Sequence, residues 1–237
     1  MPSKGKKYQA AAQMVDKTPR SLEDAIALLR RTSWANFDET VELHVTTSAD
    51  PRHADQQVRE VALLPHGTGR QVRVMVFASG DAANAAREAG ADYIADDETI
   101  RQIENGWADF EASIATPDQM GRIGRLGRYL GRRGLMPNPR TGTVVQPDEI
   151  GRAIEEVKKG RTEVRMDRTA VIHTRIGKLS FTDQQLLENL QSVLTTIVNA
   201  RPSAVKGLFI KNATLTATMG PAIRLDVSEI QAAPAAA

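Results

Sequence analysis

The most informative absence in this 237-residue sequence is cysteine, which does not occur at all. Without thiols the chain can hold no disulfide scaffold and perform no thiolate chemistry. It has no apolar run close to the roughly 20 residues that a membrane-spanning helix needs. Its basic N-terminal stretch has no apolar signal core. We therefore expect a cytoplasmic protein without membrane contact.

The motifs of common nucleotide and metal enzymes are also missing. The phosphate-binding pattern G-x-x-x-x-G-K-[ST] does not occur. The run Gly67-Thr68-Gly69 lacks the third glycine of a dinucleotide-binding loop and precedes its expected strand. Asp96, Asp97 and Glu98 are more typical of the acidic first turn of a helix than of a metal site. The histidines, which occur at no metal-ligand spacing, are His44, His53, His66 and His173. We expect no catalytic residue, cofactor or metal.

Charge is unevenly distributed along the chain, although the formal net charge is only +2. Residues 81–118 carry ten acidic residues and two arginines, a net charge of −8. Residues 119–147 carry six arginines and no acidic residue. This asymmetry favours a polyanionic partner, although a solvated charged face gives the same pattern.

Four arginines of the acid-free segment recur at helical spacing, so a helix would place them on one face. They are Arg122, Arg125, Arg128 and Arg132. Gly121, Gly124 and Gly127 recur beside them, and each costs a helix about 1 kcal/mol relative to alanine. We expect the helix to recover this by close backbone approach to another element, and to end at Gly134. Its basic face is either solvated or a contact for nucleic acid.

The segment 68–159 has the pattern of alternating strands and helices. Short apolar runs typical of buried strands alternate with helices that prolines begin and glycines end. The expected strands are 72–78, 93–95 and 110–115, and the expected helices are 81–89, 97–105 and those beginning at Pro117 and Pro147. This order predicts a three-layer, Rossmann-like α/β domain with a parallel sheet.

The two flanks of this segment predict a different architecture. The expected strands are 41–45, 162–166, 170–176, 208–219 and 222–227, and the expected helices are 22–29 and a long helix from the capping box Thr182-Asp183-Gln184-Gln185 to Val198. Residues 1–67 and 160–228 together predict one split α+β domain with an antiparallel sheet, into which 68–159 is inserted. The low-complexity residues 229–237 are expected to be disordered.

The late strand suggests contact with RNA. One of its faces carries the polar side chains Asn212, Thr214, Thr216 and Thr218. Threonine hydroxyls can bind phosphates, 2′-hydroxyls or base edges, and Gly220 admits close backbone approach. An ordinary solvent-exposed β-branched face is the alternative. Phe37 is either a core residue or a stacking platform, and with only two Trp, three Tyr and five Phe base stacking cannot be the main mode of recognition.

Six motifs in order carry a resemblance to a known family. They are Phe37-Asp38-Glu39-Thr40-Val41-Glu42-Leu43, Leu64-Pro65-His66-Gly67-Thr68-Gly69, Gly90-Ala91-Asp92-Tyr93, Gly134-Leu135-Met136-Pro137-Asn138-Pro139, Ile172-His173 with Gly177-Lys178, and Thr218-Met219-Gly220. Together they resemble the bacterial branch of the family of large-subunit ribosomal protein one, over about Lys4 to Val227. Two departures are Arg132, where the family commonly has proline, and Asn212, where relatives often carry Ser or Lys.

The resemblance implies a two-domain, non-enzymatic protein that is monomeric when free and ribosome-associated in the cytoplasm. Its implied partners are large-subunit ribosomal RNA in the large subunit, tRNA leaving the exit site beside a mobile stalk, and its own messenger RNA, whose translation it represses. Sequence alone leaves open a free RNA-binding regulator, or a nucleotide-using enzyme on 68–159.

The resemblance places the main RNA surface on the split domain. The implied contacts are Phe37, Thr40, Thr218, Met219 and Gly220, with Thr216 on the same strand as Thr218. The strand that carries His173, Lys178 and Ser180 should lie beside them. Arg52 and Lys178 would bind phosphates. The arginines of the inserted domain then become a secondary RNA or tRNA contact.

Overall fold

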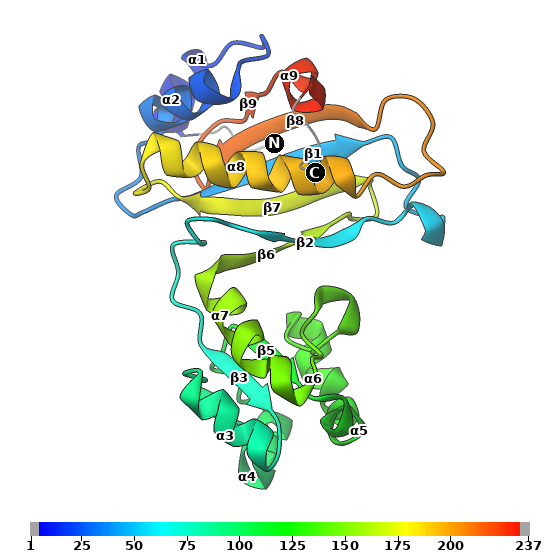
Figure 1. Ribbon diagram of the computed structural model, residues 1–237. Coiled ribbons are helices and arrows are strands. Elements are labelled where there is room, and N and C mark those ends of the chain that lie inside the picture. Colours follow the sequence, from blue (N-terminus) through cyan, green and yellow to red (C-terminus); the bar gives the residue numbers. More distant parts are fainter. Residues whose placement is uncertain (1–4, 233–237) are drawn as a thin grey trace. The chain divides into compact units, whose positions relative to one another are not determined.

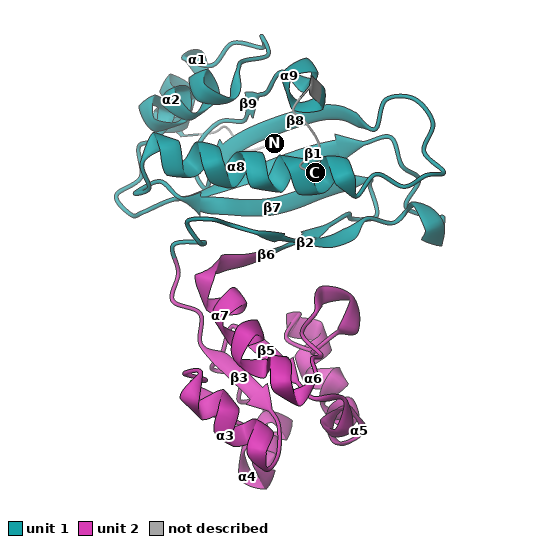
Figure 2. Ribbon diagram, viewed as in Figure 1, with its two compact units in different colours: residues 1–69, 162–237 teal, residues 70–161 magenta. Residues whose placement is uncertain are grey.

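The computed structural model describes residues 5–232. The chain divides into two compact units, which Figure 2 distinguishes by colour. The first, here called the split unit, joins Met1–Gly69 to Thr162–Ala237, and the second, the inserted unit, is Arg70–Arg161. The chain therefore leaves the split unit after residue 69, where we had placed the boundary after 67, and returns after residue 161, where we had placed it after 159.

The split unit is built on a four-stranded antiparallel sheet with the order β7-β1-β8-β9. Its strands are β1 (Thr40–Thr47), β7 (Val171–Lys178), β8 (Ile210–Ala217) and β9 (Ile223–Arg224). The predicted antiparallel sheet is thus confirmed. A separate two-stranded sheet pairs β2 (Arg59–Leu63) with β6 (Arg161–Arg165), and β2 had not been predicted.

Helices cover one face of the four-stranded sheet and leave the other face polar. They include α2 (Leu22–Thr32) and α8 (Asp183–Asn199), and Figure 1 shows α8 lying over the sheet and running along its strands. The capping box predicted for α8 is present. On β1, Val41, Leu43 and Val45 are fully buried in the core, while the residues between them are half-buried, as the two-residue period of a strand requires.

Two terminal helices of the split unit were not predicted. They are α1 (Lys6–Gln13) and α9 (Val227–Ala232). The expected disorder of 229–237 is therefore wrong for residues 229–232, because Ile230 is 1% exposed and packs in the core. Burial of this apolar side chain stabilises the helix against the core. Residues 233–237 lie outside the described part of the chain.

The inserted unit has the predicted three layers around a parallel sheet. The strands β3 (Val74–Phe77), β4 (Tyr93–Ile94) and β5 (Ala112–Ala115) pair in the order β4-β3-β5. Alternate side chains of β3 enter different cores: Val74 and Val76 pack with residues of α3 (Asp81–Glu88) and α7 (Ile150–Gly160). Met75 and Phe77 pack with α4 (Asp97–Glu104) and with residues 117–133, here called the arginine segment.

The arginine segment is not one regular helix. It alternates short 3-10 and α turns: 117–119, α5 (Met120–Ile123), 124–126, α6 (Gly127–Leu130) and 131–133. A Cβ added at Gly121, Gly124 or Gly127 would meet nothing within 4 Å, so the predicted close backbone approach is wrong. Buried apolar side chains hold the segment against the sheet instead, namely Ile123, Leu126 and Leu130. Gly134 ends it with a φ of 72°, as expected.

Candidate nucleic-acid interface

Three segments far apart in sequence meet at one end of the four-stranded sheet. Because β1 is antiparallel to both neighbours, its first residue lies beside the last residues of β7 and β8. Thr40 pairs with Lys178, and Val41 pairs with Ala217. We call the group formed there the sheet-end cluster; its members are Phe37, Thr40, Lys178, Ser180, Thr218, Met219 and Gly220. The structure thus brings together seven of the ten predicted main contacts, the other three being His173, Thr216 and Arg52.

Lys178 is held in the sheet-end cluster by both its ammonium and its stem. Its Nζ donates to the Thr40 hydroxyl at 3.0 Å and to the Asp38 carbonyl at 3.1 Å. An ammonium has three donors, so one is left for a partner. A Cβ added at Gly69 would lie 2.6 Å from Lys178 Cγ, and Gly69 has a φ of 72°. Gly69 therefore makes room for the lysine stem.

The hydroxyl of Thr218 is already used within the protein. It accepts from the backbone N–H of Thr40 at 3.0 Å, and it lies 3.3 Å from the Thr40 carbonyl oxygen. The backbone N–H of Thr218 also donates to that carbonyl at 3.1 Å. Thr218 thus extends the pairing of β8 with β1 beyond the last strand residue.

Two carboxylates that the sequence interpretation did not assign to the site hold its loops. Asp38 accepts from the backbone N–H and the hydroxyl of Ser180, at 3.0 and 2.9 Å. Glu39 is fully buried and accepts from the Ser33 hydroxyl at 2.5 Å and the Met219 backbone N–H at 2.8 Å. Their charge could have revealed them in the sequence. Two adjacent carboxylates in a motif that binds RNA would repel phosphate unless their oxygens accept hydrogen bonds from the protein itself.

Two large apolar side chains of the cluster are exposed. Phe37 is 56% exposed and Met219 is 43% exposed. The Thr216 hydroxyl lies 3.0 Å from the Ala217 carbonyl oxygen and 3.4 Å from that of Gly220, and these contacts brace the turn after β8. The sheet end therefore offers apolar contact area beside a lysine and several backbone groups.

The structure does not bring His173 and Arg52 into the sheet-end cluster. His173 lies opposite His44, midway along the pairing of β7 with β1, with their Nδ1 atoms 2.8 Å apart. Burial, and next the neighbouring His173, lower the pKa of His44, while Glu42 opposes this. Arg52 follows the far end of β1, which at about 3.3 Å per residue lies about 23 Å from Thr40.

The four arginines predicted as a secondary contact fall into two pairs. Arg122 forms an ion pair with Asp97, and Arg125 Nε lies 3.2 Å from Glu104. Arg128 and Arg132 form no ion pair with any described residue. Only the second pair therefore presents uncompensated charge.

Within 5–232, no three His, Asp or Glu side chains gather as a cluster able to hold a metal ion. No helix in the same range is long and apolar enough to cross a membrane.

Comparison with known proteins agrees with the resemblance carried by the motifs. Residues 29–221 match the ribosomal protein L1p/L10e family. The large ribosomal subunit protein uL1 of Thermomicrobium roseum is 57% identical over 230 residues, which cover 96% of this chain and 95% of that protein. The proteins of the same name from Chloroflexus aggregans and Dehalococcoides mccartyi are 52% and 49% identical, and each alignment covers 98% of both chains.

Proposed function

The chain belongs to the ribosomal protein L1p/L10e family, and from that premise we propose that it binds large-subunit ribosomal RNA through the sheet-end cluster. The protein is a structural ribosomal protein and not an enzyme. It works in the cytoplasm as part of the large ribosomal subunit. The observation that carries the proposed site is the meeting of Thr40, Lys178 and Thr218 at one end of the sheet.

Three features of the cluster suit recognition of an RNA backbone. Lys178 supplies a cation for phosphate, and its third donor is unused by the contacts above. Phe37 and Met219 supply exposed apolar surface that can pack on sugars or bases. The internal bonds of Thr218 and of the two carboxylates hold the loops in place before RNA arrives, which lowers the ordering cost of binding.

A substitution at Gly220 can distinguish an RNA-binding role of the sheet-end cluster from a purely structural role. Its φ is not positive, and an added Cβ would make only an ordinary contact, 3.4 Å from the Ala217 Cβ. The free protein therefore has no need of glycine at this position. We expect the need to come from the RNA, whose backbone would approach the Gly220 Cα closely.

The test is a salt series of binding to a fragment of large-subunit ribosomal RNA. With Lys178→Gln, we expect weaker binding and a slope of log K against log[salt] reduced by about 0.7 to 0.9, the value for one lost phosphate contact. With Gly220→Ala, we expect weaker binding at unchanged slope and unchanged thermal stability. Lys211→Gln is the matched control, because Lys211 is exposed near the start of β8, whereas Thr218 follows the end of that strand.

A salt-independent affinity, or full affinity of both Lys178→Gln and Gly220→Ala, would refute the proposed site. An equal loss with Lys211→Gln would show only general attraction between basic protein and RNA.

The finer role that we propose rests on the motif resemblance. The protein would belong to a mobile stalk that moves as tRNA leaves the exit site, and the same cluster would bind its own messenger RNA and repress translation. If one surface serves both RNAs, they must compete for the protein, and Lys178→Gln must weaken both equally. Simultaneous binding of the two RNAs would contradict the shared surface.

A secondary contact by the inserted unit is also part of the proposal. Because Arg122 and Arg125 are already ion-paired, neutralising Arg128 and Arg132 should weaken tRNA or ribosomal RNA binding more than neutralising the first two. The paired arginines serve as the control, since they lie on the same segment.

A further inference from the structure

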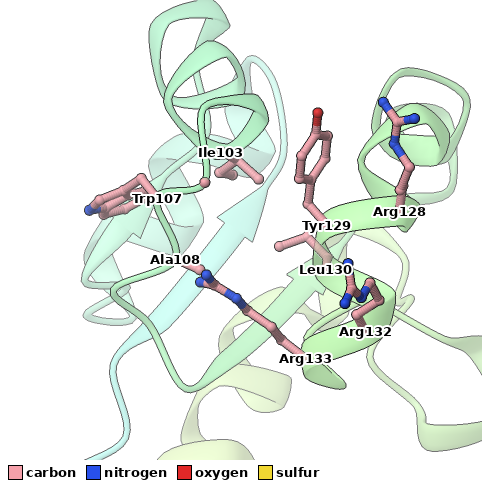
Figure 3. Close-up of a pocket in the computed structure, with 9 residues that line it drawn as sticks. Ile103, Trp107, Ala108, Arg128, Tyr129, Leu130, Arg132 and Arg133 are labelled. Atoms are coloured by element: carbon pink, nitrogen blue, oxygen red, sulfur yellow. The ribbon is translucent and has the colours of Figure 1, made fainter.

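The inserted unit contains a pocket that the sheet-end cluster does not explain. Its volume is about 380 Å³, within the range of small-molecule sites. Figure 3 shows Tyr129 and Arg133 on one side and the Trp107–Ala108 stretch on the other, with the Arg133 side chain extending toward Ala108. The remaining lining residues are Ile103, Gly106, Arg128, Leu130 and Arg132.

The charge around this pocket is of one sign. Arg128, Arg132 and Arg133 line it, and no acidic residue does. The nearest acidic residues in sequence are engaged elsewhere: Glu104 pairs with Arg125, and Asp109 pairs with Arg73. The three lining arginines form no ion pair with any residue in 5–232. The pocket therefore attracts an anion.

The walls of the pocket suit a planar ring. Trp107 packs edge-on against Tyr93 and at a tilt against Phe110, with ring centroids 5.2 and 5.8 Å apart, and Figure 3 shows its ring directed away from Tyr129. Tyr129 is half-buried opposite it, with the Arg128 guanidinium 5.5 Å from its ring centroid. Ile103 and Leu130, both almost fully buried, form an apolar floor. An apolar floor, the ring of Tyr129 and a cationic rim together match a base attached to its phosphate.

We propose that this pocket takes one unstacked nucleotide of a single-stranded RNA segment. The base would lie against Tyr129 over the apolar floor, and the adjoining phosphates would contact Arg132 and Arg133. The inference rests on the proposed function in so far as RNA is the natural polyanion for this protein, yet the site is separate from the sheet-end cluster. Proteins that hold single strands combine aromatic stacking with cationic grooves in this way.

The chain offers a direct reporter for the test. Trp34 and Trp107 are its only two tryptophans, so Trp34→Phe leaves Trp107 at the pocket as the only tryptophan, whose fluorescence can be excited selectively. In that background, a six-nucleotide oligouridylate should quench the fluorescence saturably. Tripolyphosphate, an anion without a base, should quench far less.

Variants of the pocket should separate its two components. Tyr129→Leu keeps an apolar side chain but removes the ring, and we expect at least about fivefold weaker oligouridylate binding. Arg133→Gln should lower the salt slope by about 0.7, as expected for one phosphate contact with a single strand. Arg140→Gln is the matched control, because Arg140 is exposed in the same unit but does not line the pocket.

The outcomes distinguish this pocket from the sheet-end cluster. If oligouridylate does not quench Trp107 while Lys178-dependent binding of the ribosomal RNA fragment persists, the pocket proposal is overturned and the proposed function stands. If tripolyphosphate quenches equally, or if both pocket variants bind like Arg140→Gln, the nucleotide assignment is also overturned. If quenching depends on Tyr129 and Arg133 but the ribosomal RNA fragment does not bind, the pocket stands and the proposed function fails.

Discussion

Replacement of Glu39 tests whether the sheet-end cluster is stabilised by the hydrogen bonds that this buried side chain accepts or by its charge. The Glu39 carboxylate is fully buried and accepts from Ser33 and from the backbone of Met219. Hydrogen bonds to a charged group each contribute about 1.5–3 kcal/mol. Both donors lie in partly buried surroundings, where water can replace part of each bond. We therefore expect Glu39→Ala to lower the free energy of unfolding by about 3 kcal/mol.

Glu39→Gln is the matched control for this loss. Its amide oxygen can accept from Met219, and its NH₂ group can donate to the Ser33 hydroxyl oxygen. Only the charge assistance is lost, so we expect a decrease of about 1 kcal/mol. In RNA binding, Glu39→Gln should resemble the wild type, whereas Glu39→Ala should bind more weakly because the Met219 loop is released.

The assay must report on the split unit alone. Trp34 lies in the split unit and Trp107 in the inserted unit, so a Trp107→Phe background gives urea unfolding curves for the split unit. Hydrogen exchange at the Met219 amide measures the bond itself. Wild-type stability and exchange in Glu39→Ala would refute the reasoning, and equal losses in the alanine and glutamine variants would show that charge, and not bond geometry, stabilises the site.

Three further changes have defined outcomes. Gly69→Ala should displace Lys178 and weaken RNA binding, because the new Cβ would lie 2.6 Å from the lysine Cγ in a left-handed backbone conformation; titration with the ribosomal RNA fragment measures this, and wild-type affinity would contradict it. Because the pKa of His44 is lowered from 6.5 in the folded state, by burial and then by His173, the unfolded state binds more protons. The contribution of His44 to the free energy of unfolding should thus be complete above pH 6.5 and decline as the pH falls below it. Urea unfolding one pH unit above and one below should show a smaller decline in His44→Gln than in the wild type. Asn189→Leu should cost about 3 kcal/mol of unfolding free energy, because its fully buried amide makes three hydrogen bonds to backbone groups; a thermal-unfolding midpoint equal to wild type would exclude this.

Much of the fold could be predicted because it depends on local periodicity. The alternation at Val41, Leu43 and Val45 identifies a strand with one buried face, and the capping box at Thr182 marks where α8 begins. Alternating strand and helix patterns in 68–159 were enough to predict three layers around a parallel sheet. The arginine segment shows the limit: the spacing of its glycines predicted a closely packed helix, but apolar anchors hold a succession of short turns.

The sequence by itself therefore determined the elements, their faces and, through its motifs, the family. Only the tertiary structure decided which polar groups meet. Glu39 and Met219 are 180 residues apart, and Thr40 and Thr218 are 178 apart, so their contacts depend on how strands align and not on any local repeat. The same holds for the ion pairs that leave Arg128 and Arg132 uncompensated while neutralising Arg122 and Arg125. The physical reason is that periodicity is set by neighbouring backbone geometry, whereas partners across a sheet are set by register, which burial of the whole core selects.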